Sequence, residues 1–281
     1  MTPSGPVDRV RARLARELPT AELDLLPRGY QRLGSVLVVK LPERLRPHFA
    51  AIGRAYRDEM GVATVLRRGP ISGEFRVPKM ERLAGNTSET ETREHGIVYR
   101  FDAARLMFAA GNRSERVRLP GLVAPGEMIA DLFAGIGYFT LPLAVHSRAR
   151  RIVACEANPV SFEYLRQNLR RNGVEGKVEA LLGPNETATL RAGSFDRVVL
   201  GYLPSALPWI DRALPLLTPA GGWLHVHVVI GTQDGLAAAE GAVRSSIARA
   251  GGTSLEASAR EVKPYGPGKL HAVVDVRARP P

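Results

Sequence analysis

The sequence predicts an α/β fold in which a Rossmann-like domain of mostly parallel strands follows a smaller N-terminal α+β domain. From about residue 120, short apolar strands alternate with helical patterns, which is typical of a doubly wound sheet. The first of these strands runs into a glycine-containing loop, Asp131–Gly137, and a helical stretch follows it. Before residue 100 the elements are shorter and many arginines lie among them. We therefore expect two domains, residues 1–100 and residues 101–281.

In the first predicted domain, the periodicity of apolar residues locates the elements. Val7, Val10, Leu14 and Leu18 recur at helical spacing and predict a helix over 7–18. Short apolar and β-branched runs predict strands, and a second helical pattern lies between them; these elements are strands 35–40, 62–66 and 97–101 and helix 47–60. The polar residues 86–94 predict a loop or a hairpin tip.

In the second predicted domain, apolar runs that end at turn residues mark the strands. The predicted strands are 128–133, 151–155, 178–182, 197–200, 223–229 and 270–276, and the predicted helices are 138–145, 161–172 and 236–250. Ser161 is the expected N-cap of its helix, and Gly173 lies just beyond the C-terminal end of the same helix.

Composition narrows the class of protein. The 281 residues carry a formal charge of +11, which favours a polyanionic partner such as nucleic acid. The preference for arginine that a GC-rich genome produces is an alternative explanation of this charge. The single cysteine, Cys155, excludes a disulfide framework and argues against a cysteine-based zinc site. No apolar run reaches the roughly 20 residues of a membrane span, and the N-terminus lacks a secretory pattern, so we expect a cytoplasmic protein.

The glycine loop and an acidic residue after the second strand predict the cofactor. Gly135 and Gly137 allow a ligand to approach the backbone, and Asp131 can organise the amides of the loop. Glu156 follows the second strand, 21 residues after Gly135, where a carboxylate can accept both ribose hydroxyls. The loop has no third glycine to hold a pyrophosphate, so the pattern favours S-adenosylmethionine (AdoMet) over NAD.

Several blocks of the sequence occur together and in a fixed order. They are Glu94–Asp102, Met107–Arg116, Asp131–Pro142, Glu156–Pro159 and Val262–Gly268 with His271, and together they extend over roughly residues 70–281. This order resembles the class I AdoMet enzymes that modify position 37 of tRNA. One branch of that group methylates guanosine 37, and the other builds wybutosine-type bases.

The end of the fourth strand distinguishes the two branches. The methylating branch has an Asn-Leu-Pro motif there, whereas this chain has Gly201 followed by Tyr202, Leu203 and Pro204. The chain therefore resembles the tRNA wybutosine-synthesising aminocarboxypropyltransferases. The resemblance implies transfer of the 3-amino-3-carboxypropyl group of AdoMet to a modified guanine, a wybutosine precursor, in tRNA.

The resemblance and the loop chemistry give a set of candidate residues. The expected cofactor-binding residues are Arg116, Asp131, Phe133, Gly135, Gly137, Glu156, Asn185 and Gly201. Tyr202 is the candidate catalytic residue, and His225 and His227 are candidate polar groups on the substrate side. The chain departs from the family pattern at Pro184 and Ala109, where an aspartate and a serine are usual. We expect no metal, because the sulfonium of AdoMet is already an activated leaving group.

Three alternatives remain open at the level of the sequence. A tRNA guanine-37 methyltransferase shares the fold, and an AdoMet enzyme could deliver the aminocarboxypropyl group to a small molecule instead of tRNA. A binding module without turnover is disfavoured, because Glu156 and Arg116 are both present. Arginines of the N-terminal domain are expected to contact tRNA phosphates, and they are Arg28, Arg32, Arg67, Arg68 and Arg76.

Overall fold

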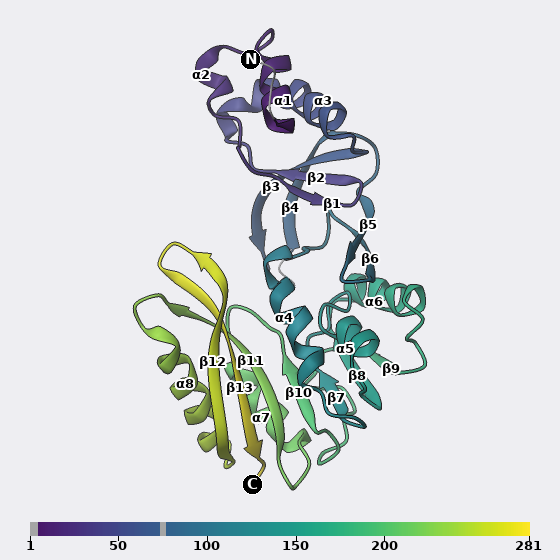
Figure 1. Cartoon of the computed structure of the whole chain (residues 1–281), viewed down its shortest axis with the longest axis vertical. Coiled ribbons are helices and arrows are strands. Elements are labelled where there is room, and N and C mark those ends of the chain that lie inside the picture. Colours follow the sequence, from purple (N-terminus) through teal and green to yellow (C-terminus); the bar gives the residue numbers. More distant parts are fainter. Residues whose placement is uncertain (1–4, 74–76) are drawn as a thin grey trace. The chain divides into compact units, whose positions relative to one another are not determined.

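The computed structural model describes residues 5–73 and 77–281, and the chain divides into two compact units between Phe108 and Ala109 (Figure 1). The first unit contains helices α1 (Pro6–Leu14), α2 (Thr20–Leu23) and α3 (Phe49–Met60) and the 3-10 turn η1 (Glu43–His48). Its strands are β1 (Gln31–Leu33), β2 (Val36–Val39), β3 (Thr64–Ser72), β4 (Val77–Ala84), β5 (Glu89–Glu94) and β6 (Ile97–Asp102).

A four-stranded sheet in the order β1-β2-β3-β4 forms the first unit, with β2 and β3 parallel and the other pairs antiparallel. Helices α1 and α3 contribute Leu14, Ile52 and Tyr56 to the core that covers this sheet. Strands β5 and β6 form a separate antiparallel hairpin.

The loop predicted over 86–94 is wrong for most of its length, because Glu89–Glu94 is strand β5. Charged residues alternate with threonines in β5, so the strand has a polar face and lacks the apolar run that was sought. Thr90 is buried, and its hydroxyl donates a 2.7 Å hydrogen bond to the carbonyl of Leu33.

The second unit contains helices α4 (Arg113–Arg118), α5 (Thr140–His146), α6 (Pro159–Arg171), α7 (Ile210–Ala213) and α8 (Gly235–Arg249). Its strands are β7 (Met128–Asp131), β8 (Arg151–Glu156), β9 (Val178–Leu182), β10 (Arg197–Leu200), β11 (Gly222–Gly231), β12 (Thr253–Gly266) and β13 (Lys269–Arg279). The 3-10 turns are η2 (Ala110–Asn112), η3 (Leu119–Leu122), η4 (Leu207–Trp209) and η5 (Leu214–Leu216).

A seven-stranded sheet in the order β12-β13-β11-β10-β7-β8-β9 runs through the second unit. Strands β11, β10, β7, β8 and β9 are parallel, which confirms the predicted Rossmann-like α/β fold. Strand β13 pairs antiparallel with β11 and with β12. Strand β12 was not predicted, because it is a half-exposed edge strand in which charged residues interrupt the apolar pattern.

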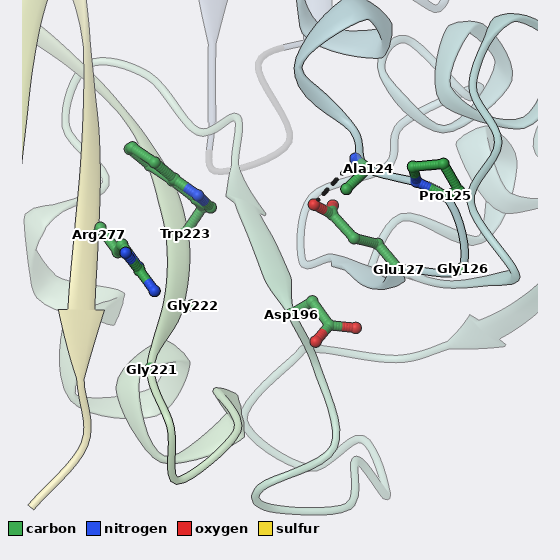
Figure 2. A pocket seen from close by; sticks show the side chains of 9 residues that line it. All are labelled: Ala124, Pro125, Gly126, Glu127, Asp196, Gly221, Gly222, Trp223 and Arg277. Carbon is green, nitrogen blue, oxygen red and sulfur yellow. Dashed lines mark hydrogen bonds between the residues drawn. The ribbon is translucent and has the colours of Figure 1, made fainter.

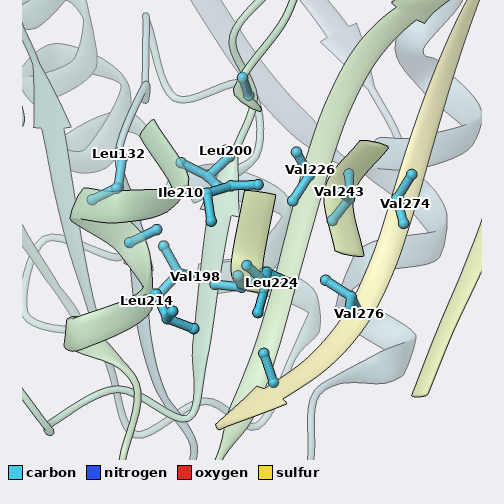
Figure 3. Packing of buried hydrophobic residues seen from close by; sticks show 14 of the residues in the cluster. Leu132, Val198, Leu200, Ile210, Leu214, Leu224, Val226, Val243, Val274 and Val276 are labelled. Carbon is cyan, nitrogen blue, oxygen red and sulfur yellow. The ribbon is translucent and has the colours of Figure 1, made fainter. Parts of the chain in front are cut away.

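The largest core of this unit lies where the parallel strands meet helices α7 and α8 (Figure 3). Leu200, Val226 and Val274 from three neighbouring strands pack with Ile210 and Val243 from the helices. Because helices cover parallel strands, β10 is buried at all four positions.

Helix α6 follows β8 and begins earlier than predicted. Asn158 is its N-cap, since its side-chain oxygen accepts a 2.9 Å hydrogen bond from the amide of Val160. The expected cap, Ser161, is wrong, because Asn158 together with Pro159 at the first helical position already starts the helix. Gly173 lies beyond the end of the helix with φ of 66°, as its placement after the helix predicted.

Candidate active site

The loop after β7 has the backbone geometry that its two glycines predicted. Gly135 has φ of 58° and Gly137 has φ of 103°, a region that other residues seldom adopt. A Cβ atom on Gly135 would lie 2.5 Å from Cε2 of Tyr138, so the loop also has no space for a side chain there. These two positions therefore keep the loop backbone bare at the carboxyl end of β7.

Asp131 ties the glycine loop to helix α5. Its side chain is fully buried and accepts hydrogen bonds from the hydroxyl of Thr140 at 2.7 Å and from the amide of Phe133 at 3.3 Å. Burial raises the pKa of Asp131 to about 6, although the bonds from Thr140 and Phe133 favour the charged form. Asp131 thus organises the loop, as expected from its place in the sequence.

Glu156 joins the ends of β7 and β8. One carboxylate oxygen accepts the amide of Gly135 at 2.7 Å, and the other accepts the amide of Asn158 at 2.7 Å. Burial raises the pKa of Glu156, and these two amides oppose that rise. The carboxylate is therefore held beside the glycine loop in a fixed orientation.

Arg116 lies on α4, close enough to the glycine loop for its charge to act there. It is 2% exposed, and its Nη1 donates to the carbonyl of Ala109 at 3.1 Å. Burial and the negative charge of Glu156 raise the pKa of Tyr138, whereas the positive charge of Arg116 opposes this rise. The pKa of Tyr138 therefore depends on the charges of both Glu156 and Arg116.

Asn185 follows β9 and has an unsatisfied acceptor. The residue is 3% exposed, and its Oδ1 is buried without a hydrogen-bond partner among the described residues. The backbone carbonyl of Asn185 accepts a 3.0 Å bond from Nε of Arg212, which fixes the turn. Because a buried amide oxygen without a partner is costly, this atom fits an N–H donor from a ligand.

Three aromatic rings meet at the ends of β7 and β10. The ring centroids of Phe133 and Tyr202 lie 5.0 Å apart, and the ring of Trp209 lies 5.0 Å from Phe133 and 4.5 Å from Tyr202. Nε1 of Trp209 donates to Glu186 at 2.8 Å. Sequence reasoning missed Trp209, because it follows Pro208 in a short 3-10 turn and carries no periodic signal.

Gly201 leaves little space at the end of β10. A Cβ atom on this residue would lie 2.9 Å from Cε2 of Phe139, which precedes α5. The ring of Phe139 in turn contacts His227, with 5.0 Å between the centroids. The end of β10 is therefore packed against the start of α5 without a side chain on Gly201.

The two histidines of β11 have different surroundings. His225 bonds to Asp275 through Nδ1 at 2.5 Å and to Arg197 through Nε2 at 2.6 Å, so both of its nitrogens are engaged within the protein. His227 bonds through Nδ1 to Nε2 of His271 at 2.8 Å. Burial lowers the pKa of all three histidines, so they are neutral. The predicted substrate-side role does not fit His225.

The arginines expected to contact phosphates also differ from one another. Arg28 is exposed, whereas Arg67 bonds to Leu41, Glu43 and Glu81, so its guanidinium serves the fold. Arg32 donates to the carbonyls of Gly34 and Met60. Nη2 of Arg68 lies 3.5 Å from Oε1 of Gln31. Arg76 lies outside the described residues.

A hollow of about 370 Å³ lies at the opposite edge of the sheet, where β7, β10 and β11 begin (Figure 2). It is lined by Ala124, Pro125, Gly126, Glu127, Asp196, Gly221, Gly222, Trp223 and Arg277. In parallel α/β sheets ligands bind at the carboxyl ends of the strands, so this hollow is not the candidate site.

Two further properties concern metals and membranes. Within residues 5–73 and 77–281, no cluster of three or more His, Cys, Asp or Glu side chains could hold a metal ion. Over the same residues, no helix is both long and apolar enough to cross a membrane. Cys155 is buried, and burial raises the pKa of its thiol to about 12.

Comparison with known proteins identifies the family. Residues 90–245, more than half of the chain, match the TRM5/TYW2 methyltransferase domain, and residues 10–88 match the TYW2 N-terminal domain. The curated tRNA(Phe) (4-demethylwyosine(37)-C(7)) aminocarboxypropyltransferase of Pyrococcus horikoshii is 34% identical over 99% of both chains.

Two solved structures cover most of the chain. TYW2 of P. horikoshii in complex with MeSAdo is 31% identical, with a TM-score of 0.85 over 97% of this chain and 99% of that one. The tRNA m1G37 methyltransferase of M. jannaschii is 25% identical, with a TM-score of 0.76 over 100% of this chain and 80% of that one. The chain therefore belongs to the TRM5/TYW2 methyltransferase domain family and carries a TYW2-type N-terminal domain.

Proposed function

We propose that this protein transfers the 3-amino-3-carboxypropyl group of AdoMet to C7 of 4-demethylwyosine at position 37 of tRNA(Phe). The observation that carries the proposal is the match to the P. horikoshii aminocarboxypropyltransferase, which extends over 99% of both chains. The TM-score and the sequence identity are also higher for TYW2 of P. horikoshii than for the m1G37 methyltransferase of M. jannaschii. Gly201, in place of the asparagine of the methylating branch, agrees with this choice.

The donor fits the residues at the carboxyl ends of β7, β8 and β9. The bare backbone at Gly135 and Gly137 permits close approach, and Glu156 is oriented to accept ribose hydroxyls. The unsatisfied Oδ1 of Asn185 matches the amino group of an adenine. Arg116 is suited to the carboxylate of the methionine arm, because a guanidinium can bind a carboxylate through two hydrogen bonds.

Phe133 and Tyr202 belong to the aromatic cluster beside this loop, and Gly201 precedes Tyr202 at the end of β10. We assign the face of this cluster to the flat acceptor base, because aromatic rings stack on bases whatever their hydrogen-bonding edges. Asp131 contributes indirectly, since it holds the amide of Phe133. In this arrangement Tyr202 contacts the acceptor base.

The chemistry follows from positioning of the two reactants. The sulfonium of AdoMet makes the γ-carbon of its amino-acid arm electrophilic. The acceptor carbon forms a bond to this γ-carbon while the sulfur–carbon bond breaks, and the electron pair goes to sulfur, so methylthioadenosine leaves. The acceptor carbon then loses its proton to water, and the ring recovers its aromatic character. The protein accelerates the transfer by holding the γ-carbon, and not the methyl group, in line with the acceptor.

Transfer RNA is the proposed partner, and we assign its contacts to exposed arginines of the first unit such as Arg28. A small-molecule acceptor and transfer of the methyl group are the alternatives. A cytoplasmic location, where tRNA is modified and used, fits this function.

Labelled donors test the proposal directly. The protein is incubated with AdoMet labelled either on the methyl carbon or on the carboxyl carbon, and with tRNA(Phe) that carries 4-demethylwyosine. We expect label in RNA from the carboxyl position only, with release of one methylthioadenosine per transfer. Methyl label in a tRNA with unmodified guanosine 37 would favour the methyltransferase alternative. The matched control is the same tRNA with unmodified guanosine 37, which should accept nothing.

A further inference from the structure

Helix α4 is six residues long and yet carries three charged side chains that are more than half buried. Glu115 is 1% exposed and Arg116 is 2% exposed, and the side chain of Arg118 is 23% exposed. A helix this short is not stable in isolation, so its position depends on tertiary contacts. The contacts of Glu115 and Arg118 therefore determine where α4, and with it Arg116, is held.

Glu115 and Arg118 attach α4 to the antiparallel strands of the sheet. Arg118 donates through Nη1 and Nη2 to the two oxygens of Asp275 on β13, at 2.5 and 3.1 Å. Glu115 accepts bonds from Arg118, at 2.8 Å, and from Arg260 on β12. Two residues one helical turn apart thus bind two neighbouring strands, which fixes both the place and the rotation of the helix.

Asp275 is itself held in place from within the sheet. It accepts Nδ1–H of His225 on β11, and His225 accepts a bond from Arg197 on β10. Arg197 donates to both oxygens of Glu127, at 2.7 and 3.0 Å. Burial by itself would raise the pKa of Asp275, but the bonds from His225 and Arg118 hold it well below its usual range.

The network is balanced in charge. Its positive members are Arg118, Arg197 and Arg260, its negative members are Glu115, Glu127 and Asp275, and His225 is neutral. Three positive and three negative charges cancel, and each ion has a partner, as burial of charge requires. Asp275 therefore provides a rigid anchor for α4.

Arg116 lies between Glu115 and Arg118 in the sequence, and its surroundings include the start of the second unit and the glycine loop. Its Nη1 donates to Ala109, and its charge acts on Tyr138 of the glycine loop. The ring of Tyr138 packs against Gly135, where a Cβ atom would lie within 2.6 Å of it. Glu115 and Arg118 thus bind α4 to β12 and β13, while the charge of Arg116, on the same helix, acts on the glycine loop.

We propose that the contacts of Arg118 and Glu115 with β12 and β13 position Arg116 for the carboxylate of the donor, so that Arg118 and Asp275 set the affinity for the amino-acid arm without touching it. The proposal rests on the proposed function in taking AdoMet as the ligand. Arg118 and Asp275 are positioning residues in this scheme, and Arg116 is the residue that binds.

Calorimetric titration of the full-length protein with two ligands tests the proposal. AdoMet contains the amino-acid arm, and 5′-methylthioadenosine lacks it. For Arg118→Met we expect the Kd of AdoMet to rise roughly 10-fold or more, the usual effect of losing a charge-assisted bond, while the Kd of methylthioadenosine changes less than about 3-fold. Arg116→Met should show the same selectivity.

Coupling between the two arginines separates positioning from a general structural effect. The double variant Arg116→Met/Arg118→Met should bind AdoMet no more weakly than Arg116→Met alone, because Arg118 acts through Arg116. The matched control is Arg151→Met, which removes an exposed arginine paired with Glu179 at 2.9 Å and should leave both Kd values unchanged.

Three results would overturn the proposal: unchanged AdoMet affinity in Arg118→Met, an equal loss of affinity for both ligands, or fully additive effects in the double variant. If Arg118→Met does not fold, the variants Arg118→Lys and Asp275→Asn are tested by the same criteria. Each of them disrupts the paired hydrogen bonds between Arg118 and Asp275 with little change in side-chain volume. Because the readout is binding, failure of transfer to tRNA would reject the proposed function and leave this inference standing.

Discussion

The carboxylate of Glu156 already accepts two backbone amides, so a glutamine at this position must turn its NH2 group toward one of them. We expect Glu156→Gln to lose one bond to the loop and one acceptor for ribose, and to raise the Kd of AdoMet roughly 10- to 100-fold, or ~1–3 kcal/mol. Calorimetric titration measures this effect. Glu179→Gln on the neighbouring strand, an exposed site, is the control and should bind normally. Equal affinities of the two variants would exclude the assigned role of Glu156.

The neutral pair of His227 and His271 predicts a dependence of stability on pH. Burial, and then the charge of Lys263, lower the pKa of His271 from 6.5 to about 4. Between these values the unfolded chain binds more protons, so stability that is full above about pH 6.5 is lost as the pH falls toward 4. For this residue alone the loss approaches ~3 kcal/mol.

Urea unfolding of the wild type and of His271→Asn at pH 7 and pH 4 measures this contribution. The stability of the wild type should fall more than that of the variant over this range. Asp131 acts in the opposite direction, because its raised pKa costs stability as the pH rises from 3.8 to about 6. The effect of Asp131 is the same in the wild type and in His271→Asn, so it cancels when the two changes in stability are compared. Parallel pH profiles would show that His271 is not a buried neutral base.

At the scale of elements, strands with continuous apolar sequences could be predicted, whereas strands in which charged residues interrupt the apolar pattern could not. Strand β10 lies where the sequence placed it and β8 ends one residue later than predicted, since parallel strands buried by helices read as continuous apolar runs. Strands β5 and β12 are edge elements with charged residues, so their pattern resembles that of a loop. The role of Arg197 in the buried ion-pair network could not be predicted, because the sequence does not distinguish a buried arginine next to an apolar run from an exposed one.

The core beside β11 predicts the cost of truncating a buried side chain. Leu224 is fully buried among strands and helices, so Leu224→Ala removes apolar contacts and leaves a cavity. We expect a loss of ~2–5 kcal/mol in the free energy of unfolding by urea. Leu255→Ala on β12 is the control, since that leucine is 43% exposed and should cost less than about 0.5 kcal/mol. A similar cost at both positions would contradict the assigned core.

At the scale of the whole molecule, the glycine loop and its acidic partner could be predicted because their residues lie close together in sequence. Asp131, Gly135 and Glu156 fall within 26 positions, and strand–loop–helix order places them at one edge of the sheet. The anchoring of α4 could not be predicted, because Arg118 and Asp275 are 157 positions apart. Contacts of that range depend on sheet order, and the strand β12 that completes them was itself missed.

The excess of positive charge predicts how tRNA binding responds to salt. The chain carries +11, and exposed arginines such as Arg28 are available in the first unit. If about five phosphates are contacted, a rise from roughly 50 to 200 mM salt should weaken tRNA binding about 10²- to 10³-fold through counterion release. The Kd of AdoMet should change little over the same range, because its bonds are short and the bound charges are buried.

Filter binding of tRNA at several salt concentrations gives the slope of log Kd against log salt. Arg28→Ala should reduce this slope by about one if Arg28 contacts a phosphate. Arg151→Ala is the matched control, since it removes the same charge from an exposed arginine of the second unit that is paired with Glu179. A slope near zero for the wild type would mean that the charge reflects composition alone. An equal reduction in both variants would mean that net charge, rather than a contact at Arg28, governs association with tRNA.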